Sequence, residues 1–406
     1  MKKILLFAVV AAVAFTSCKK KSNDETETDP FKLQYSNLST EQHKQKIEAS
    51  GVEFVQKISS LPDEKFIDVL TFLETLDLPV NSPSFSSVLA VNEAAKNKSL
   101  KGLFQATTSV EDNTAKLSEL YGVYTWNAST ETWDESVSTS KLEFKFPSAP
   151  EKTTNDATLT MTYTKSNVVV ASEDDGESVE LPASVSSTLR VGSKDEMKLI
   201  SSYEYKTDGT PTKVDINFML GSFSLITKVS NDVTNLTSEF SILKGTEVLL
   251  SLKTSANGNL AVDNAKDAEE FDAVVKNANA TFEIMNIKLA GQVEVKAIRD
   301  AEKAASNLSE AEQNKKEETA WNTYSKLVAI NKTDNTVIAK VQFKGITGEK
   351  YCYTDYYTNI ETCDTDYYLD PQLVFKDGSP MSIDEFFEGS FGTLIDDLDE
   401  FSTDFE

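Results

Sequence analysis

The spacing of apolar residues changes along the chain and divides it into two parts. Between residues 39 and 100, apolar side chains recur at spacings of three and four, which is typical of amphipathic helices. From residue 121 the period changes to two. Leu142, Phe144 and Phe146 alternate with charged residues, and similar alternation returns near residues 160, 216 and 250. The pattern therefore predicts a helical segment followed by a series of strands.

The helical segment carries its own start signals. Ser39 and Gln42 have the spacing of a capping box, and Pro62 suits the first turn of a second helix. A third helix is expected over residues 86–100. The second helix has one apolar face, made by Phe66, Val69, Leu70, Leu73 and Leu76.

The strands follow one another closely, which predicts an antiparallel meander rather than parallel units with crossover helices. Asp208-Gly209, Lys244-Gly245 and Asn257-Gly258 are turn signals between them, and Trp126 and Trp133 flank a four-residue loop across which they can pair. One face of the strands is apolar and the other is rich in Thr and Ser. The predicted fold class is α+β: a large curved antiparallel meander with helices packed on its apolar face.

After residue 260 the pattern mixes. We expect a helix over 266–276, then two strands near 282–284 and 293–295 with Gly291 at their turn. Residues 298–328 read as helical, and a capping box at Ser309 predicts that this stretch breaks into two helices. Further strands are expected over residues 337–343 and 373–375, on either side of a cysteine hairpin.

The N-terminus has the composition of a secretory signal. Lys2 and Lys3 precede an apolar run over residues 4–15, and Thr16-Ser17 leads into Cys18. The apolar run is too short to span a bilayer as a helix. Two cleavage points fit: one before Cys18, and one after Ala14, which would leave Phe15 first.

With its terminal cysteine, this segment resembles the signal of a bacterial lipoprotein, and the layout resembles uncharacterised outer-membrane lipoproteins of the Bacteroidota. The resemblance implies that Cys18 is the lipidated first residue of the mature chain, an acylated (palmitate-type) anchor on the outer membrane. Phe15 departs from the usual leucine of the motif. In that group, acids soon after the cysteine direct export to the cell surface. Here they follow three lysines, so the periplasmic and cell-surface faces both stay open.

The expected organisation has five segments. The polar run after Cys18 predicts a flexible tether, and the body is expected to pack as one unit. The segments are a signal peptide (1–17), the lipidated cysteine with its tether (18–30), a helical segment (31–115), the antiparallel meander (116–298), and a helix with a small disulfide-bearing β/α segment (299–406).

Charge excludes some partners. The chain has 65 acidic and 40 basic residues and a formal net charge of −25. Nucleic acid and anionic lipid would be repelled, so we expect no nucleic acid and a membrane contact only through lipid on Cys18. The acidic, Phe-rich tail from Asp384 either docks on the body or binds a partner.

Cys352 and Cys363 are the only cysteines after Cys18. In an exported protein, an isolated pair is most simply a disulfide. A hairpin loop over residues 356–359 would place the two cysteines opposite each other. The tyrosines beside them suit either cross-strand packing or stacking on a sugar ring.

Catalytic motifs are missing from the sequence. The one histidine, His43, has only polar neighbours and is expected on an exposed helix face. We therefore expect no catalytic residues, no enzyme activity and no cofactor. Calcium is a weak candidate for a bound ion, since carboxylate oxygens are among the donors that it prefers. The weak candidate ligands are Asp355, Asp364, Asp366 and Asp370.

These features favour a lipid-anchored, exported, non-enzymatic lipoprotein with a structural or binding role, whose ligand (protein, glycan or lipid) is unknown. One alternative is a carrier that holds a hydrophobic ligand under the curved sheet. Another is a carboxylate-dependent glycan hydrolase, which needs two suitably spaced acids.

Overall fold

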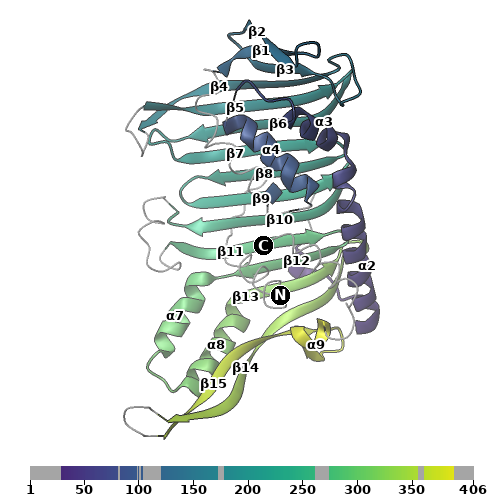
Figure 1. Ribbon diagram of the computed structural model, residues 1–406. Coiled ribbons are helices and arrows are strands. Elements are labelled where there is room, and N and C mark those ends of the chain that lie inside the picture. Colours follow the sequence, from purple (N-terminus) through teal and green to yellow (C-terminus); the bar gives the residue numbers. More distant parts are fainter. Residues whose placement is uncertain are drawn as a thin grey trace. The chain divides into compact units, whose positions relative to one another are not determined.

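The computed structural model of the protein describes residues 29–80, 83–97, 99, 102–103, 120–171, 178–260, 274–354 and 361–387. Within them, sixteen strands form one open, mainly antiparallel sheet accompanied by helices (Figure 1). The strands lie across the sheet in chain order, except that β1 lies between β2 and β3. The predicted α+β class is confirmed.

The chain forms two compact units, each assembled from separated stretches of sequence. Unit 1 consists of Met1–Ser50, Asp232–Thr237 and Leu252–Gly392, and unit 2 of Gly51–Asn231, Ser238–Ser251 and Thr393–Glu406. Helix α2 (Thr40–Ile58) and strands β9 (Asn235–Lys244) and β10 (Glu247–Gly258) contribute residues to both.

Unit 2 contains the first strands, which pair in antiparallel order from β3 to β8. Trp126 pairs with Trp133 across the first hairpin, as predicted. The strands are β1 (Gly122–Asn127), β2 (Thr132–Val137), β3 (Leu142–Phe146), β4 (Ala157–Ala171), β5 (Ser178–Val191), β6 (Lys194–Tyr205), β7 (Pro211–Leu220) and β8 (Phe223–Asn231).

One pairing in unit 2 contradicts the all-antiparallel prediction. β1 and β3 are parallel, with Gly122 opposite Leu142. The chain reverses direction twice between them, so β3 runs the same way as β1 and pairs with its second edge. The sequence pattern shows the strands but not which edge each one joins.

The two faces of unit 2 differ as predicted. Leu159, Leu199 and Phe218 are buried on one face, whereas their neighbours in sequence are more exposed. The helices α3 (Lys65–Glu74) and α4 (Pro83–Lys96) lie over strands of this unit in Figure 1. The apolar face of α3 is buried, through Phe66, Ile67, Val69, Leu70 and Leu73.

Unit 1 contains the remaining strands and helices. Its antiparallel ladder runs from β11 to β16. The elements are the 3-10 helix η1 (Pro30–Lys32), β11 (Val275–Ile284), β12 (Ile287–Val293), α7 (Val295–Ala305), α8 (Glu310–Tyr324), β13 (Ser325–Asn331), β14 (Thr336–Thr354), β15 (Glu361–Val374), β16 (Pro380–Ser382) and α9 (Ile383–Phe387). A second 3-10 helix, η2 (Leu61–Asp63), belongs to unit 2.

Three boundary predictions in this part of the chain are wrong. Gly291 lies inside β12 opposite Ala280, because the turn is at residues 285–286. Asn257-Gly258 ends β10 and makes no hairpin turn. Lys276, the predicted end of a helix, lies in β11, and residues 261–273 lie outside the described part of the chain. Glycine and asparagine mark turns statistically, whereas a glycine within a strand also allows close backbone packing.

The capping boxes are confirmed at both predicted positions. The Gln42 side chain accepts a hydrogen bond from the Ser39 N–H at 2.9 Å, and the Ser39 hydroxyl accepts one from the Gln42 N–H at 3.3 Å. Ser309 starts α8 in the same way with Glu312, so the stretch from 298 divides into two helices. Its last residues form β13 instead of helix.

Candidate binding site

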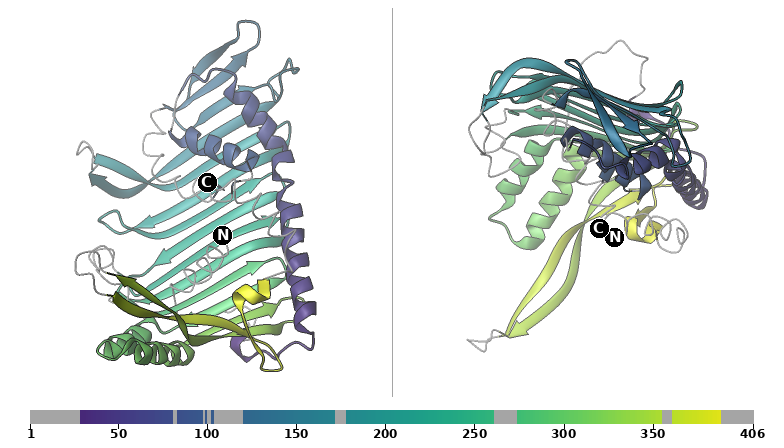
Figure 2. Two further views of the ribbon diagram at one scale, coloured as in Figure 1. Left: turned by 60° about the horizontal axis from the view of Figure 1, so that its bottom comes forward. Right: turned by 45° about the horizontal axis from the view of Figure 1, so that its top comes forward.

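The long hairpin of β14 and β15 extends beyond the part of unit 1 that supports it. β13 pairs with β14 only as far as Lys340, and β16 pairs with β15 only from Gln372 to Val374. Beyond these points the two strands pair with each other, and in the right-hand view of Figure 2 they continue past α8. We call residues 347–354 and 361–371 the distal ribbon. Among the described residues, no further strand pairs with either of its edges.

Helix α8 covers the edge of β14 just before the distal ribbon begins. The Asn322 amide donates to the Phe343 carbonyl at 2.7 Å, and its oxygen accepts from the Phe343 N–H at 2.8 Å. Glu318 accepts from the Gly345 N–H at 2.8 Å, and Asn314 donates to the Ile346 carbonyl at 3.0 Å. These three side chains are four residues apart, so they lie on one face of the helix. They take the place of a neighbouring strand.

The Glu318 carboxylate is suited to this position. The hydrogen bond from the Gly345 N–H and the nearby Lys344 ammonium hold the pKa of Glu318 below its ordinary value. The carboxylate is therefore ionised at neutral pH and accepts a charge-assisted hydrogen bond from the backbone. Side chains of α8 thus supply hydrogen-bond partners to the edge of β14 up to the start of the distal ribbon.

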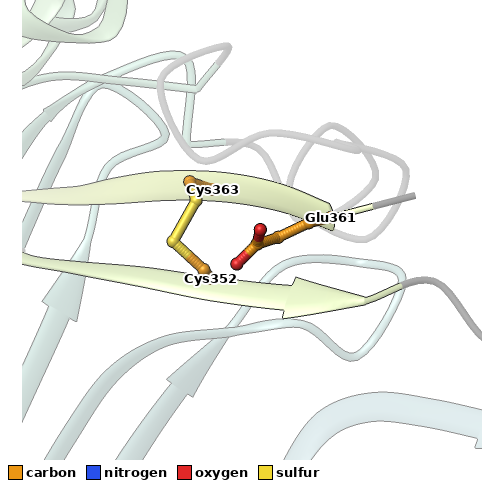
Figure 3. A group of neighbouring side chains, drawn as sticks. All are labelled: Cys352, Glu361 and Cys363. Carbon is orange, nitrogen blue, oxygen red and sulfur yellow. A yellow bond between two sulfur atoms is a disulfide. The ribbon is translucent and has the colours of Figure 1, made fainter. Parts of the chain in front are cut away.

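A disulfide joins the strands of the distal ribbon. Cys352 and Cys363 are directly paired, with their sulfur atoms 2.04 Å apart and their Cα atoms 4.0 Å apart (Figure 3). The predicted pairing is confirmed, while the predicted loop residues lie outside the described part of the chain. Closing a loop of this size stabilises the folded hairpin by about 2–3 kcal/mol, mainly by restricting the unfolded chain.

Two exposed tyrosines lie on one face of the distal ribbon. Tyr351 is 55% exposed and Tyr368 is 48% exposed. Tyr351 pairs with position 364, so it shares a face with the even-numbered residues of β15, which include Tyr368. Gly348 lies against Tyr368: a Cβ atom at this position would be 3.3 Å from the tyrosine ring. A side chain at position 348 would therefore crowd the Tyr368 ring.

Two of the four predicted metal ligands have described side chains. Asp366 is exposed and Asp370 is half-buried, where it accepts a hydrogen bond from Gln372 at 3.1 Å. Asp355 and the side chain of Asp364 lie outside the described part of the chain. Among the described residues, the one group of three donors with metal-like spacing is Cys352, Glu361 and Cys363.

That group does not offer a metal site while the disulfide is intact. A cysteine binds a metal as the thiolate, and both sulfur atoms are already bonded to each other. Glu361 lies beside them as an exposed carboxylate (Figure 3). Calcium at Asp366 or Asp370 therefore stays an untested prediction. Glu361 is not among the predicted ligands, although its place in the hairpin follows from the register of the two cysteines.

The predicted exposure of His43 is wrong. Its side chain is 2% exposed, and its Nδ1 atom has no hydrogen-bond partner among the described residues. Burial lowers the pKa of His43, and this effect is opposed by the charge of Asp334 and reinforced by that of Lys46. The neighbours of His43 in sequence are polar, but its own side chain is buried.

The pKa of one carboxyl on α8 is raised by a neighbouring acid. Burial and the charge of Glu302 raise the pKa of Glu317, while Glu302 accepts a hydrogen bond from Arg299 at 2.7 Å. A carboxylic acid with a raised pKa is the usual general acid of a glycan hydrolase. Burial and the charge of Glu93 raise the pKa of Glu74 in the same way, so the raised pKa does not single out one pair for the hydrolase alternative.

Other predictions concern the ends of the chain. Cys18 and the tether before residue 29 lie outside the described residues. The start of the acidic tail packs onto unit 1: Phe386 is 2% exposed, stacks on Phe375 at 5.7 Å, and has the Lys44 ammonium over its ring. No helix in the described part of the chain has the length and apolar character needed to cross a membrane.

Comparisons with known proteins identify no relative of this chain. No protein-family model, no curated protein and no solved structure matches the chain.

Proposed function

We propose that this protein is an exported, non-enzymatic lipoprotein of the outer membrane, anchored by lipid on Cys18, and that it binds its partner through the distal ribbon. The observation that carries the proposal is the disulfide-closed ribbon itself. It extends beyond its support, carries exposed Tyr351 and Tyr368, and has no strand on its edges among the described residues.

Two features support export and binding together. Disulfides persist in oxidising compartments outside the cytoplasm, which agrees with the secretory signal. A crosslink between paired strands also holds the ribbon in one conformation before a partner arrives, which lowers the entropic cost of binding. Exposed tyrosines are common in binding surfaces because they combine a large apolar ring with a polar end.

The proposal can be tested by photo-crosslinking in living cells. A photoreactive amino acid replaces Tyr351 or Tyr368 in the full-length protein, and a matched control carries it at Val137, which is 91% exposed on β2. We expect adducts from the two ribbon positions and none from position 137. Adducts from all three positions, or from none, would show that the ribbon is not the binding element.

The glycan hydrolase alternative is supported by two carboxyls with a raised pKa, Glu317 near Glu302 and Glu74 near Glu93. It predicts that the protein cleaves glycans and that Glu317→Gln or Glu74→Gln abolishes cleavage while folding is retained. The non-enzymatic proposal predicts no cleavage by either protein.

The carrier alternative stays a prediction. A lipid retained by protein extracted from its own membrane, seen in native mass spectrometry, would support it.

A further inference from the structure

The hydrogen bonds between Asn322 and Phe343 establish which backbone groups of β15 face away from β14. Phe343 directs both its N–H and its C=O to Asn322 on α8. In an antiparallel pair, opposite residues either exchange two hydrogen bonds or make none. Pro371, which pairs with Phe343, therefore directs its own backbone groups outward, away from β14.

The cysteine pair gives the same result independently. Antiparallel residues that do not exchange hydrogen bonds have Cα atoms about 4.5 Å apart, against about 5.5 Å for those that do. The Cα atoms of Cys352 and Cys363 are 4.0 Å apart. Cys363 and Pro371 thus both belong to the outward set, as the alternation along β15 requires. The one register shift between these positions adds its extra residue to β14, so the alternation along β15 is unbroken.

The outward set defines an open edge. Between Cys363 and Pro371, the outward residues are Thr365, Tyr367 and Leu369. β16 covers the edge from Gln372 onward, and Pro371 has no N–H to offer, so it ends the open stretch. No strand among the described residues pairs with residues 361–371 on this side. The edge is long enough to accept a strand of several residues.

The charge of the residues along this edge determines which kind of strand it can bind. Residues 361–371 contain four acids and no base. Asp366, Tyr368 and Asp370 alternate on one face, and the first two are exposed. A strand added beside them would place every second side chain next to a carboxylate or a tyrosine ring, and cationic side chains suit both. A second copy of this chain, with a net charge of −25, would be repelled.

We infer that the outer edge of β15 binds an extended, basic polypeptide segment by β-strand addition. The backbone of the segment pairs with the outward groups of Thr365, Tyr367 and Leu369, and its alternating Lys or Arg side chains lie beside Asp366, Tyr368 and Asp370. Main-chain hydrogen bonds supply affinity in this binding mode, and the alternating side chains supply specificity. This inference rests on the proposed function, because it names the partner class of the same ribbon.

The test uses a fluorescent nine-residue peptide of alternating Lys and Thr, with binding to the full mature protein in detergent measured by anisotropy. Two matched peptides act as controls. One replaces each Lys with Glu, and the other keeps Lys but is N-methylated at alternate residues, which blocks the hydrogen bonds of one edge and leaves the charge unchanged. We expect the Lys peptide to bind at least roughly tenfold more tightly than either control.

Two protein variants separate the backbone contribution from the charge contribution. Thr365→Pro removes an outward N–H that β14 does not use, so the ribbon should fold, form its disulfide and lose roughly tenfold in affinity. Asp366→Lys with Asp370→Lys should cause a similar loss. Equal binding of the N-methylated peptide would reduce the interaction to charge attraction and overturn the inference, as would equal binding of the Glu peptide or no binding of the Lys peptide.

If a second copy of the chain occupied the edge, analytical sedimentation would show a dimer, and Thr365→Pro would dissociate it. This outcome would also overturn the inference. Failure of the inferred peptide binding is distinguishable from failure of the proposed function. If the Lys peptide does not bind but the photo-crosslinks from Tyr351 and Tyr368 persist in cells, the ribbon binds a partner of another class. If both fail, the ribbon is not a binding element.

Discussion

Asn322 makes with Phe343 both of the hydrogen bonds that a neighbouring β-strand would make. The amide group donates at 2.7 Å and accepts at 2.8 Å, so one side chain of α8 ends the ladder of β14 where β13 stops. Unpaired edges are prone to unwanted pairing with other chains. Here α8 closes the edge of β14 at the base of the hairpin, whereas no described strand pairs with either edge of the distal ribbon.

Asn322→Ala should loosen the base of the ribbon. Without the amide, the Phe343 N–H and C=O lose their partners, which costs about 1–3 kcal/mol where the groups are shielded from water. We expect faster hydrogen exchange at the Phe343 amide. Asn322→Asp is the matched control, because its carboxylate still accepts from the N–H and should keep that amide protected. Unchanged exchange in the alanine variant would show that α8 does not close this edge.

His43 should make stability depend on pH. Burial lowers its pKa below the value of 6.5 that it has in the unfolded chain. The unfolded state therefore binds the proton more readily, and the free energy of unfolding should decrease as the pH falls through about 6.5. Urea unfolding at pH 7.5 and 5.5 measures this change.

His43→Leu is the control for that measurement. Leucine keeps the position apolar and removes the unpartnered Nδ1 atom, so the difference between the two pH values should shrink. His43 is the one histidine of the chain, and most carboxylates titrate below this range. An equal loss of stability in both proteins would mean that another group is responsible.

Val233 should be strained. It has a φ of +68° in the turn between β8 and β9, a backbone conformation that β-branched residues rarely adopt. Its carbonyl accepts a hydrogen bond from the Leu260 N–H at 2.7 Å, which holds the turn in place. Val233→Gly should be more stable than Val233→Ala by about 1 kcal/mol, since both remove the branched side chain but only glycine tolerates this φ. Thermal unfolding of the two variants checks this prediction. Equal thermal stability of the alanine and glycine variants would contradict it.

Local features of the fold were predictable from the sequence. The capping boxes at Ser39 and Ser309 involve residues three positions apart, and the cysteine register follows from spacing within one hairpin. The Trp126–Trp133 pair is local in the same way. Each of these depends on neighbours along the chain, which a single sequence displays directly.

Features that depend on distant segments were not predictable. His43 has polar neighbours in sequence, yet its side chain is buried, and the charge that acts on it from outside its own helix belongs to Asp334, far along the chain. Asn314, Glu318 and Asn322 look like solvent-exposed positions of a charged helix until β14 is placed beside them. The closed edge of β14 therefore had no signal in the sequence, whereas the tyrosines and cysteines of the distal ribbon did.

The most direct test of the account is peptide mapping by mass spectrometry, without reduction, of protein purified from the envelope of its own cell. We predict an N-terminal peptide that begins with acylated Cys18 and a crosslinked pair of peptides that joins Cys352 to Cys363. A mature chain that begins at Phe15, or free thiols at both Cys352 and Cys363, would contradict the account of an exported lipoprotein with a disulfide-closed binding ribbon.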